Sequence, residues 1–400
     1  MTLESSSVPQ DSTLETLPPV FLIGAGVVGT AIAQSHLDAG VAFCIGDQDA
    51  DVLQQAAQQL VLPSDNWSIT QRQIPGLSLP GLCVQDESID IRTRPWIVIE
   101  SVVERLDVKQ TLFNVVGGVF GASAAYCSNT SNLRIADIAA GLNDASGFCG
   151  MHFFMPVTER HAVEIVGHDG TSQPTLTRAS THARRLNKEP IEVADGPGFL
   201  VNRMLSPYIN QSMLLLTTGA SADQIAAGAA AFGMPMSPLE LIDWIGSRTL
   251  FHAGRAFWQA FPHRLSPSPM VAGLVKNDRP GRAAGRGFYD YVGGLRSENL
   301  APITRELIER YRTDQRVYSL TDIEHLLAIP MWIEGIAALA EGVANGPEQI
   351  DIAMRCGLGY RHPLGWNGYF EALGKTQMDS AIAKWSDAFA SMRMPSPDST

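Results

Sequence analysis

The feature that most constrains the fold of this chain is a glycine-rich turn between a short apolar strand and a helix. Val20 to Ile23 is an apolar run, and Gly24-Ala-Gly-Val-Val-Gly29 follows it at once. Residues 30–39, rich in small side chains, predict a helix, a second strand is predicted at 41–45, and Asp47 lies just past its end. Strand, glycine turn, helix, strand and acid follow in the order that a dinucleotide-binding unit requires.

The glycines of this turn have separate predicted roles. Gly24 permits a tight turn, Gly26 lets a pyrophosphate approach the backbone, and Gly29 lets helix and strand pack closely. The helix start at Val27 and Val28 would offer unpaired N–H groups and a positive dipole end to the phosphates. A tight turn without a ligand is the alternative explanation.

Asp47, 21 residues after Gly26, is the predicted ribose ligand. Its carboxylate would accept hydrogen bonds from the adenosine ribose hydroxyls. No Arg or Lys neighbours it to receive a 2′-phosphate, which favours NAD over NADP. A surface aspartate at a strand end is the simpler alternative.

Alternating strands and helices continue to residue 195 and predict a doubly wound, Rossmann-type α/β domain over 19–195, after a mobile lead-in at 1–18. The stretch 51–94 is less regular, because Pro63, Pro75 and Pro80 interrupt any long helix. The further predicted elements are strands at 96–99, 124–127, 148–154, 162–166 and 191–193, and helices at 106–116 and 175–186.

The pattern beyond Gly196-Pro-Gly198 is helical and contains an internal repeat. Gln224-Ile225 and Pro238 recur 125 residues later as Gln349-Ile350 and Pro363, while Pro207 and Pro330 match two residues out of register. We therefore predict two tandem all-α domains, at about 196–293 and 300–400.

Composition indicates a compact globular chain, 45% apolar and 18% charged, with a net charge of −12. This charge argues against nucleic acid or anionic membranes as general partners, and the sequence contains neither a spanning apolar run nor a secretory signal. None of the five cysteines has metal-site or C-x-x-C spacing, so no metal is predicted. Cys44, Cys127 and Cys149 lie in apolar strands, where free cysteines act as small hydrophobes, and we expect a cytoplasmic protein.

Two polar constellations follow predicted strands. Ser128-Asn-Thr-Ser131 lies where open α/β sheets bind ligands, although a helix cap would also explain it. His152 and Glu164 are twelve residues apart on a predicted strand–turn–strand. A carboxylate at one imidazole nitrogen would leave the other free to take a substrate proton. From the pair alone, catalytic and purely structural roles both stay open.

Several stretches together resemble the 3-hydroxyacyl-CoA dehydrogenase family over roughly residues 19–375. The chain looks like the dehydrogenase half of the bifunctional fatty-acid oxidation alpha subunit, without the hydratase half. The matching stretches are Cys149-Gly-Met-His-Phe-Phe, Glu164-Ile, Asp195-Gly-Pro-Gly-Phe-Leu-Val-Asn-Arg, Ser128-Asn-Thr-Ser, Met234-Pro-Met-Ser-Pro-Leu-Glu-Leu-Ile-Asp and Gly285-Arg-Gly-Phe-Tyr.

The resemblance implies roles for individual residues. His152 is the general base that takes the 3-hydroxyl proton while hydride leaves for the nicotinamide, and Glu164 holds His152. Ser131 and Asn202 hydrogen-bond the substrate oxygen and the nicotinamide end. Two further positions match cofactor contacts, and these are Glu104 and Lys109.

The sequence departs from the family in four places. Met155 occupies a position where the family has an Asn beside the nicotinamide. Ala283 replaces a Lys that precedes Gly-x-Gly-Phe-Tyr, and Cys356 replaces a Tyr that contacts the substrate. Residues 51–94 replace a longer Lys-bearing hairpin that holds coenzyme A in relatives. Since a lost charged contact costs roughly 1.5 to 3 kcal/mol, a carrier-protein-bound or shorter acyl substrate, or a biosynthetic role, is an open alternative.

The leading hypothesis is an NAD-dependent 3-hydroxyacyl thioester dehydrogenase, working in either direction on a CoA or acyl-carrier-protein thioester. The alternatives are a nucleotide-binding scaffold or complex subunit that has lost catalysis, and a dehydrogenase of a non-thioester 3-hydroxy acid. Short relatives pair their helical domains across a homodimer. Here the tandem repeat would supply the second helical domain, so we expect a monomer.

Overall fold

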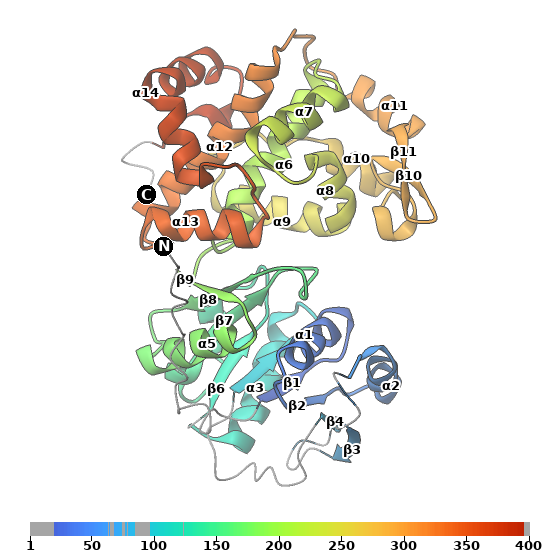
Figure 1. Ribbon diagram of the computed structural model, residues 1–400, viewed down its shortest axis with the longest axis vertical. Helices are drawn as coiled ribbons and strands as arrows, with labels where there is room; N and C mark the ends of the chain where they lie inside the picture. The colour runs from blue at the N-terminus through green and yellow to red at the C-terminus, as the bar shows by residue number, and fades with distance from the viewer. Residues whose placement is uncertain are drawn as a thin grey trace, which may run out of the picture.

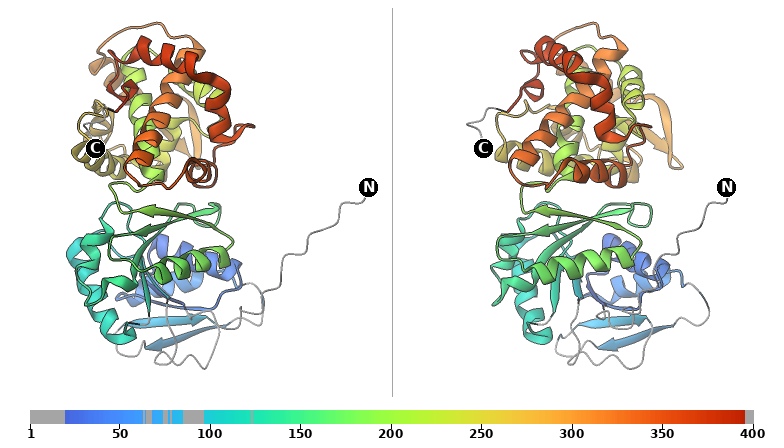
Figure 2. Two further views of the ribbon diagram at one scale, coloured as in Figure 1. Left: turned by 90° about the vertical axis from the view of Figure 1, so that its left-hand side faces the viewer. Right: turned by 60° about the vertical axis from the view of Figure 1, so that its left-hand side comes forward.

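The computed structural model describes residues 20–395 except 63, 65–67, 74–76, 78, 85–96 and 123, so the predicted lead-in lies outside the described residues. A sheet domain and a helical body are stacked along the long axis of the molecule (Figures 1 and 2). The chain crosses between them after the ninth strand of the sheet. The division into an N-terminal α/β part and a C-terminal helical part agrees with the predicted fold class.

Among the described residues, nine strands form one sheet whose middle is parallel. In spatial order they are β3 (Ile69–Gln73), β4 (Pro80–Val84), β2 (Phe43–Gly46), β1 (Val20–Ile23), β5 (Ile97–Glu100), β6 (Ala125–Ser128), β7 (Phe148–Phe153), β8 (Ala162–Gly167) and β9 (Glu189–Ala194). Strand β1 is fully buried, and its side chains alternate between the two faces, with Phe21 and Ile23 in one core and Val20 and Leu22 in the other.

Helices cover both faces of the sheet, as a doubly wound fold requires. Those on one face share a core with Val20 and Leu22, and they are α1 (Val27–Asp38), α2 (Ala50–Gln59) and α5 (Gln173–Arg185). Those on the other face share a core with Phe21, and they are α3 (Leu106–Phe120) and α4 (Ile135–Ala139). A short 3-10 turn, Ala145–Gly147, precedes β7.

The described part of the segment 51–94 is more regular than its prolines indicated. It contains most of α2 and the antiparallel β3–β4 hairpin, which extends the sheet next to β2. Pro80 is the first residue of β4, where a strand tolerates proline.

The hairpin also overturns the expectation for Cys44. Its register places Cys44 opposite Cys83, with Cα atoms 4.1 Å apart, and the two are joined in a disulfide. The prediction that Cys44 is a free small hydrophobe was therefore wrong, because the strand that carries Cys83 was not expected. Cys127 and Cys149 are free and buried as predicted. Cysteine usage no longer supports a reducing compartment, and the cytoplasmic location stays a prediction.

The two predicted helical domains pack into one body with a continuous core. Helix α6 (Val201–Thr217), with Pro207 inside it, lies against α12 (Leu320–Ala340), with Pro330 inside it, so the two helices of the predicted repeat face each other. Helix α12 is long and apolar enough by composition to cross a membrane, but 67% of its most apolar window is buried, as in a core helix. The boundary between the two domains stays a prediction.

The helical body also contains a small antiparallel hairpin that the helical pattern did not indicate. The helices of the helical body are α6 (Val201–Thr217), α7 (Ala222–Phe232), α8 (Pro238–Ile245), α9 (Ser247–Ala260), α10 (Met270–Lys276), α11 (Pro302–Arg310), α12 (Leu320–Ala340), α13 (Pro347–Ile352) and α14 (Gly365–Trp385). The remaining elements are the hairpin strands β10 (Tyr289–Val292) and β11 (Leu295–Leu300), 3-10 turns at Arg282–Ala284 and Ala390–Met392, and a π-helical turn at Ala353–Gly357.

Candidate active site

The predicted His152–Glu164 pair forms in the structure. The two residues are directly opposite in the antiparallel β7–β8 pair, and His152 Nδ1 lies 2.7 Å from Glu164 Oε2. Phe154 and Phe199 flank the imidazole at ring-centroid distances of 4.9 and 5.7 Å. The carboxylate thus orients the ring and leaves Nε2 as the nitrogen that can exchange a proton.

Glu164 also ties the helical body to the sheet. Its Oε1 accepts hydrogen bonds from the backbone N–H groups of Leu200 and Val201, at 2.9 and 2.8 Å, where α6 begins. Glu164 is fully buried, so both oxygens are satisfied without water. The N-terminal end of α6 therefore stabilises the carboxylate that holds His152.

The glycine turn has the geometry that a dinucleotide needs. A Cβ on Gly29 would lie 1.9 Å from the Gly24 carbonyl oxygen, and Gly24 has φ +97°, so neither position accepts a side chain. A Cβ on Gly26 would meet nothing within 4 Å. Val27 and Val28 open α1, Val27 is exposed, and no side chain caps the helix. This open helix start fits the pyrophosphate of NAD.

Asp47 lies beside the turn, and its carboxylate already accepts two backbone hydrogen bonds. Its Oδ2 accepts the Ala25 N–H at 2.7 Å, and its Oδ1 accepts the Asp49 N–H at 3.0 Å. Each carboxylate oxygen keeps acceptor capacity, so a ribose hydroxyl can still bind.

Glu104 and Lys109 belong to a network beneath the cofactor site. Lys109 is 1% exposed, its Nζ pairs with buried Glu100, and it lies 3.5 Å from Glu104 Oε2. Glu104 Oε1 accepts the Thr130 hydroxyl at 2.6 Å and the Ser131 backbone N–H at 3.0 Å. The ammonium of Lys109 therefore reaches the loop of Ser131 through Glu104, and its contact with the cofactor stays a prediction.

Asn202 is half-buried in the first turn of α6, next to a buried ion cluster. No hydrogen bond joins its side chain to a residue that the structure describes, so it can serve a ligand. The neighbouring Arg203 pairs with Glu334 of α12 and lies 2.7 Å from Glu341, which directly follows that helix. Burial raises the pKa of Glu334, but the adjacent guanidinium groups oppose this shift.

Two of the departures from the family pattern, Met155 and Cys356, lie near this site. Met155, in the turn after β7, is 46% exposed. Cys356 lines a hollow of about 340 Å³ with His161 and Arg184, and burial raises the pKa of its thiol. Cys356 is next to Gly357, where an added Cβ would lie 3.7 Å from the Phe154 ring.

The basic loop near Ala283 is occupied by internal contacts. Arg286 pairs with Asp278 at 2.6 Å, and the Arg282 guanidinium lies 4.1 Å from the Trp244 ring centroid. Neither arginine is a free replacement for the lysine that the family has at Ala283.

Three structural features around the candidate site had not been predicted. Asn129 accepts the Phe153 N–H at 2.8 Å and lies 3.2 Å from the Ser101 hydroxyl, so it ties β6 to the end of β7. Glu100 is a buried acid at the end of an apolar strand, an unusual position that could have been noticed. The Arg203–Glu334 pair spans 131 residues, and no local signal indicates it.

The Gly-x-Gly-Phe-Tyr stretch has a structural explanation. Buried Asp243 accepts the backbone N–H groups of Phe288 and Tyr289 and the Tyr291 hydroxyl, while burial raises the pKa of its carboxyl. A Cβ on Gly287 would lie 1.9 Å from Asp243 Oδ1, so only glycine fits there.

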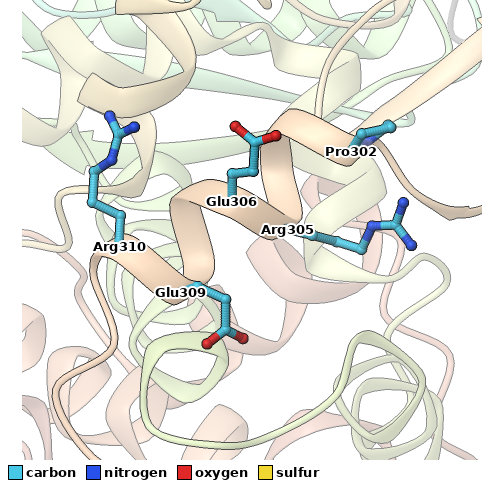
Figure 3. Close-up of a pocket in the computed structure, with 5 residues that line it drawn as sticks. All are labelled: Pro302, Arg305, Glu306, Glu309 and Arg310. Carbon is cyan, nitrogen blue, oxygen red and sulfur yellow. The ribbon is translucent and has the colours of Figure 1, made fainter.

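A larger hollow, of about 540 Å³, lies on α11 and is lined by charged side chains (Figure 3). It is formed from a single helix, and none of the candidate site residues lines it. The described part of the chain brings no three His, Cys, Asp or Glu side chains together to hold a metal ion.

Comparisons with known proteins agree with this arrangement. Residues 19–196 match the 3-hydroxyacyl-CoA dehydrogenase NAD binding domain, and residues 198–291 match the C-terminal domain of the same family. The fatty acid oxidation complex subunit alpha of Colwellia psychrerythraea is 31% identical over 379 residues, 92% of this chain and 52% of that protein. The chain thus spans about half the length of this relative.

Two solved structures show the same fold. The (S)-3-hydroxybutyryl-CoA dehydrogenase from Ralstonia eutropha is 28% identical, with a TM-score of 0.59, over 69% of this chain and all of that one. The 3-hydroxybutyryl-CoA dehydrogenase from Escherichia coli covers 95% of this chain and 97% of its own, with 21% identity and a TM-score of 0.73. Because residues 19–196 and 198–291 match the two domains of one family, the chain belongs to the 3-hydroxyacyl-CoA dehydrogenase family, whose N-terminal domain binds NAD.

Proposed function

We propose that this protein interconverts a 3-hydroxyacyl thioester and its 3-keto form with NAD as the redox partner. The observation that carries the proposal is the buried His152–Glu164 pair, fixed by the first turn of α6 at the same edge of the sheet as the glycine turn. Bound NAD supplies the acceptor for the hydride that leaves C3 of the substrate.

In the oxidation direction, His152 Nε2 accepts the proton of the 3-hydroxyl group while the C3–H bond breaks. Glu164 keeps the other ring proton on Nδ1 and stabilises the imidazolium that forms. In the reduction direction, the same nitrogen returns the proton to the 3-keto oxygen.

Ser131 and Asn202 would orient the reacting oxygen from opposite sides of the domain junction. Ser131 is held on its loop by Glu104, and Asn202 is carried by α6. Lys109 acts through Glu104, and Met155 would pack against the nicotinamide without a polar contact. Cys356 would lie at the substrate side of the junction.

A comparison of three substrates tests the proposal. Acetoacetyl-CoA, the same acyl group on an acyl carrier protein, and free acetoacetate are each incubated with NADH and the purified protein. We expect rapid oxidation of NADH with a thioester and slow oxidation with the free acid.

The rival functions predict other results. Preference for the free acid would indicate a dehydrogenase of a non-thioester hydroxy acid. If the protein binds NADH but turns over none of the three, it is a nucleotide-binding scaffold.

We also propose a monomer, because α12 of the second repeat covers α6 of the first. Light scattering that gave twice the chain mass of 43.2 kDa would contradict it.

A further inference from the structure

Glu100, the last residue of β5, is a buried acid that the proposed chemistry does not use. It follows three apolar residues of its strand and is 0% exposed, and among the acids of the described residues it shares this value only with Glu164. A buried carboxylate is costly unless opposite charge and hydrogen bonds compensate for it. Glu164 holds His152, and the partners of Glu100 also lead to the candidate active site.

Both carboxylate oxygens of Glu100 have side-chain partners. Oε1 pairs with the Lys109 ammonium, and Oε2 accepts the Ser128 hydroxyl at 2.6 Å. Ser128 is the last residue of β6, and its Oγ in turn accepts the Thr130 N–H at 3.3 Å. Glu100 therefore holds the start of the loop that carries Ser131.

Lys109 connects Glu100 to the far side of the same loop. Its side chain is 1% exposed, and its ammonium lies between two carboxylates, that of Glu100 and that of Glu104, with Nζ 3.5 Å from Glu104 Oε2. Glu104 Oε1 accepts the N–H groups of Ser131 and Asn132, both at 3.0 Å. Because Glu100 balances the ammonium, Glu104 keeps its own negative charge for the loop.

The strand end at Glu100 also touches both halves of the candidate site. The Glu100 carbonyl oxygen accepts the Asn129 N–H at 2.8 Å, and Asn129 Oδ1 accepts the N–H of the residue after His152 at 2.8 Å. The next residue, Ser101, approaches the glycine turn, since a Cβ on Gly24 would lie 2.5 Å from the Ser101 carbonyl oxygen. Strand β5 thus lies between the glycine turn and the strand of the catalytic base.

We propose that Glu100 is a positioning residue for the reaction, because it fixes the loop of Ser131 through Lys109 and Ser128. The inference rests on the proposed function, in which Ser131 orients the reacting oxygen. A purely structural ion pair is the alternative, since a buried pair can often be replaced by apolar side chains without loss of stability. The alternative predicts changes in stability alone, whereas the positioning role predicts changes in rate that depend on Ser131.

Glu100→Gln removes the charge and nearly keeps the shape of the side chain. Lys109 is then left with Glu104 as its one carboxylate partner in the described part of the chain. The ammonium moves toward Glu104 and draws that carboxylate away from the N–H groups of Ser131 and Asn132. A displacement of about 1 Å in a group that positions the substrate is sufficient to lower the rate by about 100-fold.

A double-mutant cycle tests whether Glu100 acts through Ser131. The proteins are wild type, Glu100→Gln, Ser131→Ala and the combined variant, each assayed by oxidation of NADH with acetoacetyl-CoA. We expect Glu100→Gln to lower kcat by about 30- to 100-fold in the wild-type background and by less than about threefold in the Ser131→Ala background. Equal losses in the two backgrounds would overturn the proposal, because a general structural defect does not depend on the Ser131 hydroxyl.

Glu192→Gln is the matched control. Glu192 lies on β9 of the same sheet and accepts the Ser180 hydroxyl at 2.6 Å, as Glu100 accepts that of Ser128. No hydrogen bond or ion pair joins it to the described residues of the Ser131 loop. Its kcat should stay within about twofold of wild type. A loss as large as that of Glu100→Gln would overturn the proposal.

Amide hydrogen exchange of the loop separates this inference from the proposed function, because it needs no substrate. If the wild type turns over no thioester, the proposed function fails, but exchange still tests the role of Glu100. The N–H groups of Ser131 and Asn132 should exchange on the order of tenfold faster in Glu100→Gln than in Glu192→Gln. Unchanged exchange in the loop would refute the inference, and so would an equal acceleration across the whole sheet, which indicates a general loss of stability.

Discussion

Replacing Glu164 with glutamine tests the pairing that holds the catalytic base. Glutamine has nearly the same shape but replaces one acceptor oxygen by a donor NH₂. If the NH₂ faces His152, it donates to Nδ1 and moves the ring proton to Nε2. Nε2 can then no longer accept a substrate proton in the oxidation direction. The imidazolium that returns a proton in the reduction direction is also disfavoured, because its Nδ1–H would face the NH₂. If the amide turns over, the NH₂ instead faces the Leu200 and Val201 N–H groups, donor against donor.

Either orientation has a cost that can be estimated. A buried donor left without an acceptor costs roughly 1 to 3 kcal/mol of stability. The wrong tautomer has a larger effect on rate, about 10⁴-fold for the corresponding change in serine proteases. We therefore expect Glu164→Gln to lower kcat by about 10³- to 10⁴-fold and the free energy of unfolding by roughly 1 to 3 kcal/mol.

The assay is steady-state oxidation of NADH with acetoacetyl-CoA, together with urea unfolding and NADH binding. Glu192→Gln is the matched control, because Glu192 lies on the neighbouring β9 and accepts the Ser180 hydroxyl at 2.6 Å without touching His152. Its kcat should stay within twofold of wild type. A Glu164→Gln protein with more than a tenth of wild-type kcat would refute the assigned role of the carboxylate.

Burial lowers the pKa of His36 to about 4 and that of its partner His182 well below 6.5, so the unfolded chain binds protons that the folded pair does not. The free energy of unfolding should therefore fall between about pH 6.5 and pH 4, by on the order of 3 kcal/mol for His36. In urea titrations, the double variant His36→Leu with His182→Leu should lose less of this free energy over the same pH range than wild type. An equal loss in both proteins would contradict the prediction. Gly287→Ala places a Cβ against the Asp243 carboxylate and should cost roughly 1 to 3 kcal/mol in chemical unfolding, whereas a change under about 0.5 kcal/mol would show that the site relaxes freely. Glu334→Gln breaks a buried ion pair and should lower the free energy of unfolding by roughly 3 kcal/mol, and a neutral effect would mean that the remaining acids compensate for it.

Local patterns in the sequence were sufficient to predict the dinucleotide unit. Apolar runs, glycines and Asp47 are close in the chain, and the structure places them as expected, with Gly24 and Gly29 in contact. That His152 and Glu164 face each other was predicted for the same reason, since they lie twelve residues apart in two predicted strands joined by a turn.

What the sequence missed depends on contacts between distant segments. The β3–β4 hairpin was hidden because prolines weaken the strand pattern, and the Cys44–Cys83 disulfide was missed with it. The hydrogen bonds from the start of α6 to Glu164 join residues that are 36 and 37 positions apart in the sequence, and no periodicity of the sequence indicates such a contact. Family resemblance placed Lys109 near the cofactor, but its burial beside Glu100 depends on the packing of α3 against the sheet.

The most direct test of the central claim follows NADH oxidation with acetoacetyl-CoA by wild type and by His152→Gln. NADH binding to both proteins is measured in parallel by fluorescence. We predict that both bind NADH equally, while His152→Gln loses at least 10³-fold in kcat. Equal turnover by the two proteins, or no turnover by the wild type, would contradict the assignment of His152 as the group that moves the proton.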